Sequence, residues 1–170
     1  MKKMLFAAGS AVFLLAAQMT AYADSGFEQP ENVTACITKD KARSIAQDYI
    51  TEGSKFQFAE HKTGSYEVVY YNDALQEYYQ VNVDSLNGDV HSYKSWLFRH
   101  KGSKNVSFNE EQAKQLVLDE YPDASDLEVS LDYKGEFKSY RVDFTSEDGK
   151  GTWEINPESG TIIGKCMEWE

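Results

Sequence analysis

The sequence has little of what most enzyme and metal sites are built from. Its 170 residues include 2 cysteines, 3 histidines and 3 prolines. It contains no H-E-x-x-H, C-x-x-C or G-x-S-x-G segment, so it carries no signature of a zinc peptidase, a redox dithiol or a serine hydrolase. A metal site that used the isolated His61, His91 or His100 would need ligands from distant parts of the chain. We therefore expect no catalytic residues, no metal and no cofactor.

Basic residues are also scarce. There are 17 Lys and Arg against 28 Asp and Glu, which gives a net charge of −11 at pH 7. A protein that binds nucleic acid needs a basic surface, so we exclude nucleic acid as a partner. The acidity suits either a solvated surface or a basic partner, and both remain open.

Long apolar runs are missing, apart from one near the N-terminus. Two lysines open the chain, residues 5–17 are apolar, and the small-residue site Ala21-Tyr22-Ala23 follows. This pattern predicts a signal peptide at residues 1–23, cleaved after Ala23, because a membrane anchor would need about 20 apolar residues. The mature chain begins with the segment 24–35, and loss of two lysines and no acid changes its net charge to −13. We expect a secreted, periplasmic or cell-envelope protein of bacterial origin.

The two cysteines, Cys36 and Cys166, lie near the two ends of the mature chain. A secreted chain with an even number of cysteines most simply pairs them, so we expect a disulfide, worth on the order of 4 kcal/mol because it closes a long loop. Two free thiols are the alternative.

The segment 33–36 also resembles the lipobox of bacterial lipoproteins, but acidic residues separate it from the apolar run, so we expect no lipid anchor.

The mature chain is internally duplicated. At an offset of 71 residues, and then of 72, apolar and turn residues recur in pairs, for example Ala42 with Ala113, Ile45 with Leu116, Gly64 with Gly135, Val83 with Ile155 and Gly88 with Gly160. A constant offset through both residue classes favours a repeat. We expect repeat 1 at residues 36–99, a linker at residues 100–105 and repeat 2 at residues 106–170.

Each repeat opens with a helix and continues with strands. Thr38 and Asn109 are N-cap residues, and apolar side chains then recur at helical spacing until Gly53 or Pro122 ends the segment. Behind each helix, short alternating runs are separated by turn residues, the pattern of an antiparallel meander. The sequence therefore predicts an α+β fold of two tandem α-β-β-β-β repeats, each a helix packed on one face of a four-stranded antiparallel sheet.

Two segments of each repeat resemble the PepSY domain. In the first they are Thr38-Lys39-Asp40-Lys41-Ala42 and residues 79–90; in the second they are residues 109–113 and 153–162. The second departs at Asn156, where the family usually has Asp. PepSY domains occur in propeptides of secreted thermolysin-like metallopeptidases and in bacterial envelope proteins. The resemblance therefore implies a module that is not an enzyme and that modulates peptidases, and it transfers no functional residues.

Tyrosines cluster in the first repeat, as the pairs Tyr70-Tyr71 and Tyr78-Tyr79, with Trp96 further on. Successive strand residues point to opposite faces, so we expect one member of each pair in the core and the other on the open face. That face is either packed between the repeats or offered to a partner, since aromatic side chains are enriched at binding surfaces. All five are candidate partner-binding residues.

The function expected from these observations is binding. We expect a secreted, non-enzymatic PepSY-like protein that inhibits or modulates an extracytoplasmic peptidase. The alternative is a module that binds a small ligand or a cell-envelope polymer on an aromatic sheet face. The turn at residues 84–89 resembles a calcium loop but has Leu86 where a ligand oxygen is required, so we expect no calcium site.

Overall fold

The computed structural model describes residues 36–169. The predicted signal peptide, the cleavage after Ala23 and the segment 24–35 lie outside these residues. None of the described helices is long and apolar enough to cross a membrane.

Each half of the described chain begins with a capped helix. Helix α1 (Lys39–Ala46) follows Thr38, whose side chain accepts a hydrogen bond from the Lys41 N–H, and a 3-10 turn, η1 (Gln47–Tyr49), extends it. Helix α2 (Glu110–Glu120) follows Asn109, which exchanges side-chain and backbone hydrogen bonds with Gln112 in a capping box. Both predicted N-caps are therefore confirmed, and each satisfies N–H groups that have no partner within the helix.

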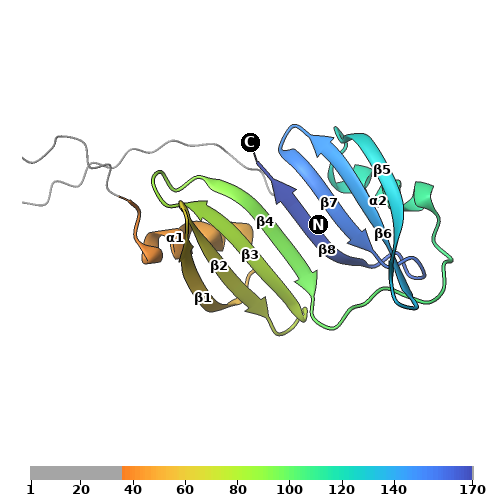
Figure 1. Cartoon of the computed structure of the whole chain (residues 1–170), viewed down its shortest axis with the longest axis horizontal. Helices are drawn as coiled ribbons and strands as arrows, with labels where there is room; N and C mark the ends of the chain where they lie inside the picture. Colours follow the sequence, from red (N-terminus) through yellow and green to blue (C-terminus); the bar gives the residue numbers. More distant parts are fainter. Residues whose placement is uncertain (1–35, 170) are drawn as a thin grey trace, which may run out of the picture. The chain divides into compact units, whose positions relative to one another are not determined.

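Four strands follow each helix. They are β1 (Lys55–Lys62), β2 (Ser65–Asn72), β3 (Glu77–Asp84) and β4 (Val90–Leu97), then β5 (Ser125–Lys134), β6 (Phe137–Ser146), β7 (Gly149–Ile155) and β8 (Ile162–Glu168). All pairings are antiparallel, and the order across the sheet is β1-β2-β3-β4-β8-β7-β6-β5. Figure 1 shows β4 and β8 side by side where the two halves meet.

The predicted α+β class is confirmed, but the prediction of two four-stranded sheets is wrong. The strands form one eight-stranded sheet, because β4 pairs with β8 from Ser92 opposite Glu168 to Trp96 opposite Gly164. An unpaired edge strand leaves a row of N–H and C=O groups without partners, and joining the last strand of each half satisfies both rows at once. The division into repeats at residues 36–99 and 106–170 stays a prediction.

Both helices cover the same face of this sheet. In the first half, Ala42 and Ala46 of α1 pack on side chains of β1, β2 and β3, and in the second half Ala113 and Val117 of α2 pack on side chains of β6 and β7. The strand register carries this face across the junction, because Tyr93 of β4 pairs with Met167 of β8. The opposite face, which we call the open face, is covered by no helix or strand among residues 36–169.

The open face does not pack between the two halves of the described chain. The halves join edge to edge through β4 and β8 rather than face to face. No described helix therefore shields the open face from solvent or from a partner.

Candidate binding surface

Four aromatic side chains meet at one end of the open face, and we call them the aromatic patch: Tyr71, Tyr78, Trp96 and Phe98. The Tyr71 and Tyr78 ring centroids are 4.6 Å apart, and the Tyr78 ring stacks on the Trp96 indole at 5.4 Å with an interplanar angle of 15°. Phe98 meets the rings of Tyr71 and Tyr78 edge-on at 6.3 and 5.8 Å. These are the separations at which aromatic pairs attract one another.

Strand register places three of these rings in one row. Tyr71 of β2 lies opposite Tyr78 of β3, which lies opposite Trp96 of β4. Side chains opposite one another on neighbouring strands are about 5 Å apart, close enough for rings to stack. The row is therefore a direct consequence of antiparallel pairing.

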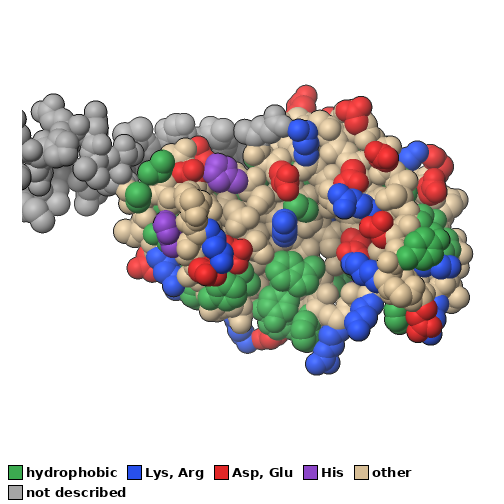
Figure 2. Space-filling view, in the orientation of Figure 1, with side chains coloured by type: hydrophobic (Ala, Val, Ile, Leu, Met, Phe, Trp, Pro, Cys, Tyr) green, Lys and Arg blue, Asp and Glu red, His purple; other side chains and the backbone are tan. Residues whose placement is uncertain are grey.

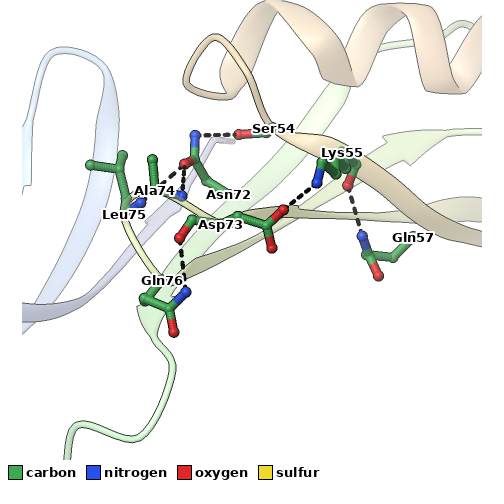
Figure 3. A network of polar contacts seen from close by, with 8 residues as sticks. All are labelled: Ser54, Lys55, Gln57, Asn72, Asp73, Ala74, Leu75 and Gln76. Carbon is green, nitrogen blue, oxygen red and sulfur yellow. Dashed lines mark hydrogen bonds and ion pairs between the residues drawn. The ribbon is translucent and has the colours of Figure 1, made fainter.

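A hydrogen-bonded turn fixes the strand ends that carry the patch. In the β2–β3 turn, the Asn72 side-chain oxygen accepts the N–H groups of Ala74 and Leu75 at 3.0 and 3.1 Å, and its amide donates to the Ser54 hydroxyl at 3.2 Å (Figure 3). An ion pair between Lys55 and Asp73 ties the same turn to β1. Asn72 is buried, so its hydrogen bonds are made in a protected environment.

Phe98 follows the end of β4 and was missed by the sequence-based prediction. Its N–H donates to the Gln76 carbonyl at 2.7 Å, which holds it against the β2–β3 turn. The signal that could have found it is alternation, because Phe98 stands two residues after Trp96 and continues the same face. The guanidinium of Arg99 lies 4.9 Å from the Phe98 ring centroid.

Two of the five candidate residues are not on this surface. Tyr70 and Tyr79 are 1% and 2% exposed and belong to the core beneath α1. The Tyr70 hydroxyl donates to the Arg43 carbonyl at 3.0 Å, and the Tyr79 hydroxyl lies 2.6 Å from a Glu77 carboxylate oxygen and 3.0 Å from the Thr51 hydroxyl. Burial raises the pKa of both phenols. The prediction that Tyr70 and Tyr79 contact a partner is therefore wrong. Alternation along each strand places Tyr71 and Tyr78 on the open face and their neighbours Tyr70 and Tyr79 in the core.

Two rings of the aromatic patch are exposed, and the other two, Tyr71 and Tyr78, are half-buried. Trp96 is 38% exposed and Phe98 is 40% exposed, whereas the largest ring of the core, Trp153, is fully buried. Figure 2 shows apolar side chains gathered over the ends of β3 and β4, with Lys and Arg side chains beside them. A cluster of exposed rings on an uncovered sheet face is typical of a binding surface.

A shallow hollow of about 570 Å³ lies between residues 100–101 and the β5–β6 hairpin. It is lined by His100, Lys101, Lys134, Gly135, Glu136 and Phe137. Lys134 donates to a Glu154 carboxylate oxygen at 3.0 Å, and Lys104 pairs with Glu136 at 2.7 Å. Two of the lysines at this hollow are therefore paired with glutamates.

The structure does not form the predicted disulfide. Cys36 and Cys166 are both free thiols, the first exposed and the second partly buried. Cys166 lies on the open face, in register with Lys94 and Thr152, whereas Ile37, directly after Cys36, packs in the core under α1. Burial raises the pKa of the Cys166 thiol, which makes it less reactive.

The remaining acidic, histidine and cysteine side chains of the described residues are those whose chemistry could hold a metal ion. Among residues 36–169, no three His, Cys, Asp or Glu side chains are grouped as metal ligands. In the turn at residues 84–89, the Asp84 carboxylate accepts the N–H groups of Leu86 and Asn87 and contacts His91, which lowers the pKa of Asp84. Its oxygens are therefore used to form the turn.

The comparisons with known proteins concern the second half above all. Residues 109–165 match the PepSY family model, described as "Peptidase propeptide and YPEB domain". No curated protein sequence matches the chain. Among solved structures, the chain is similar to a protein described as a "putative lipoprotein" from Clostridium difficile 630, at 17% identity over 79% of this chain and 97% of that one, with a TM-score of 0.29. The family match therefore covers residues 109–165, from the N-cap of α2 into β8, and the other residues lie outside it.

Proposed function

We propose that this chain is a secreted, non-enzymatic binding protein that inhibits or modulates an extracytoplasmic peptidase through its aromatic patch. The first half has the same order of elements as the PepSY domain of the second half, so we propose it as a second, PepSY-like unit. The observation that carries the proposal is a stacked row of rings, with Trp96 exposed and Tyr71 and Tyr78 half-buried, on a sheet face that no described helix or strand covers.

The residue types of the aromatic patch are those that carry most of the binding energy at protein interfaces. Binding energy at protein interfaces concentrates in a few Trp, Tyr and Arg side chains near the centre of a well-packed patch. Here Tyr71, Tyr78 and Trp96 are held rigidly by stacking and by the strand register, so a partner would order few additional side chains on binding. Arg99 lies against the same patch.

The test uses the mature chain, residues 24–170, and peptidases secreted by the organism that produces it. The protein is immobilised, retained peptidases are identified, and the activity of each is then measured with increasing amounts of the protein. We expect stoichiometric retention and inhibition or activation, both lost in the double variant Tyr78→Ala with Trp96→Ala. The control is Tyr133→Ala, which removes a 66% exposed ring from β5, outside the aromatic patch. Unchanged activity of every secreted peptidase would refute the proposal.

A second candidate function is binding of a small ligand or a cell-envelope polymer on the same face. The hollow between residues 100–101 and the β5–β6 hairpin favours it, because its lining combines polar side chains with the Phe137 ring, which suits a ligand that is partly apolar. Thermal-shift measurements with wall fragments and small metabolites would separate this function from the first. A ligand that raises the melting temperature of the wild type, but not of Trp96→Ala, would support it.

A further inference from the structure

One position on the open face, next to the aromatic patch, has no side chain. Gly164 of β8 lies directly opposite Trp96 of β4 and directly opposite Glu154 of β7. A Cβ built on Gly164 would meet nothing closer than 3.5 Å. Trp96 and Glu154 are two strand spacings apart, about 9.6 Å, and between them the face carries only backbone.

This gap borders a free aromatic face. The Tyr78 ring covers one side of the Trp96 indole from the β3 side, stacked at 15°. The other side of the indole is directed toward β8, where Gly164 leaves it uncovered, in keeping with its 38% exposure. A ring stacked on that side at about 3.5 to 4 Å would lie over Gly164. We call this place the Gly164 site.

The charge around the site is opposite in sign to that of the whole chain. From residue 90 to residue 109 the sequence contains no Asp or Glu, although the chain has a net charge of −11. Lys94, Arg99 and Lys101 fall in this stretch, and none of them has a carboxylate within 4 Å in the part of the chain that the structure describes. At physiological ionic strength, charges beyond about 8 Å are screened, so a ligand at the site experiences the local basic charge.

The acids that do lie nearby are already paired. Glu136 is held by Lys104, and one Glu154 oxygen accepts both the Lys134 ammonium at 3.0 Å and the Ser139 hydroxyl at 2.8 Å. One Glu154 oxygen is thus occupied, and the other lies 3.9 Å from the place that a Gly164 Cβ would take, so it borders the site as a hydrogen-bond acceptor. A sugar ring would need free donors and acceptors around its hydroxyl groups, whereas a flat apolar ring needs only the indole face, so these contacts favour an aromatic side chain.

We propose that the Gly164 site binds an aromatic side chain carried by an acidic segment of a partner protein. The ring stacks on the exposed face of Trp96 over Gly164, and flanking carboxylates pair with Lys94, Arg99 and Lys101. This inference rests on the proposed function as a protein-binding module and specifies which partner surface the module recognises. The net charge of the chain alone would have pointed to a basic partner.

The test uses three capped pentapeptides and the mature chain, residues 24–170, labelled with nitrogen-15. The probes are Glu-Glu-Phe-Glu-Glu, Glu-Glu-Ala-Glu-Glu and Lys-Lys-Phe-Lys-Lys, titrated while the amide and indole N–H signals are followed by NMR. We expect the first to bind most tightly, to shift the Trp96 indole signal and to weaken as salt is raised. Loss of one aromatic stack should weaken binding by about two- to tenfold.

Two variants locate the contact. Trp96→Ala removes the indole, and Gly164→Val fills the gap without removing any ring; both should weaken binding of the Phe peptide by a similar factor. Tyr133→Ala is the control and should leave it unchanged. Equal affinity for all three peptides, or full affinity in both Trp96→Ala and Gly164→Val, overturns the proposal. So does tighter binding of an oligogalacturonide than of any peptide, which would assign the site to an anionic sugar.

Failure here differs from failure of the proposed function. If Trp96→Ala and Gly164→Val still modulate a peptidase while no peptide binds, the Gly164 site is wrong and the modulator function stands. If the acidic Phe peptide binds at Trp96 but no secreted peptidase is affected, the acidic partner segment stands and its assignment to a peptidase is wrong.

Discussion

The two tyrosines at positions 78 and 79 should respond in opposite ways to truncation, although they are neighbours in sequence. Tyr79 is 2% exposed beneath α1, and its hydroxyl is shared between Glu77 and Thr51. Tyr78 is only partly buried, on the open face. We expect Tyr79→Ala to lower the free energy of unfolding severely and Tyr78→Ala to lower it little while abolishing partner binding.

The magnitudes follow from what each ring contacts. Removal of a buried aromatic ring costs about 3 to 5 kcal/mol, because it leaves a cavity as well as losing buried area. Tyr78→Ala loses its stacking on Tyr71 and Trp96, worth about 0.5 to 1.5 kcal/mol per pair, and its vacated space opens to solvent. Since domains are stable by only about 5 to 15 kcal/mol, Tyr79→Ala approaches global unfolding and Tyr78→Ala does not.

The assay is urea unfolding, monitored by far-ultraviolet circular dichroism. The slope of the free energy of unfolding against urea concentration should be the same in all variants if unfolding is two-state. Tyr79→Phe distinguishes the loss of the hydrogen bonds from the effect of the cavity, because it removes only the hydroxyl. It should lower the free energy of unfolding by about 1 kcal/mol. If Tyr78→Ala proves as destabilising as Tyr79→Ala, the assignment of the two rings to opposite faces is refuted.

Three further predictions follow from the same structure. Gly151→Ala should destabilise by about 1 to 3 kcal/mol through overpacking, since its Cβ would lie 2.1 Å from the Phe144 ring, whereas Gly164→Ala should be nearly neutral; equal urea midpoints for the two variants would contradict this. Burial raises the pKa of Tyr93 and of Tyr121 from 10 to about 12, and these phenols therefore ionise first in the unfolded chain. Stability should be intact below pH 10 and fall between pH 10 and pH 12, and a flat urea midpoint over that range would refute it. Alkylation without reductant should modify both thiols, the exposed Cys36 before Cys166; an intact mass lower by two hydrogens would instead reveal a disulfide.

Much of the local structure could be read from the sequence. Thr38 and Asn109 begin helices because their side chains accept N–H groups that a helix leaves unpaired. The alternation rule correctly divided each tyrosine pair between core and open face. Alternation alone does not say which member of each pair is buried, because a shift of register by one residue exchanges the two faces. The sequence therefore predicts Tyr70 and Tyr79 as contacts equally with Tyr71 and Tyr78.

The arrangement of the halves and the make-up of the binding surface were decided only in three dimensions. Pairing of β4 with β8 depends on backbone N–H and C=O groups, which every strand presents alike. The pattern of side chains in the sequence therefore does not predict this pairing. That single pairing opposes Gly164 to Trp96 and sets Cys166 on the open face. By itself the sequence determined the elements, their caps and their amphipathic faces, since these depend on residues close along the chain. The aromatic patch, the Gly164 site and the two free thiols depend on residues far apart in the sequence, and only the tertiary structure placed them.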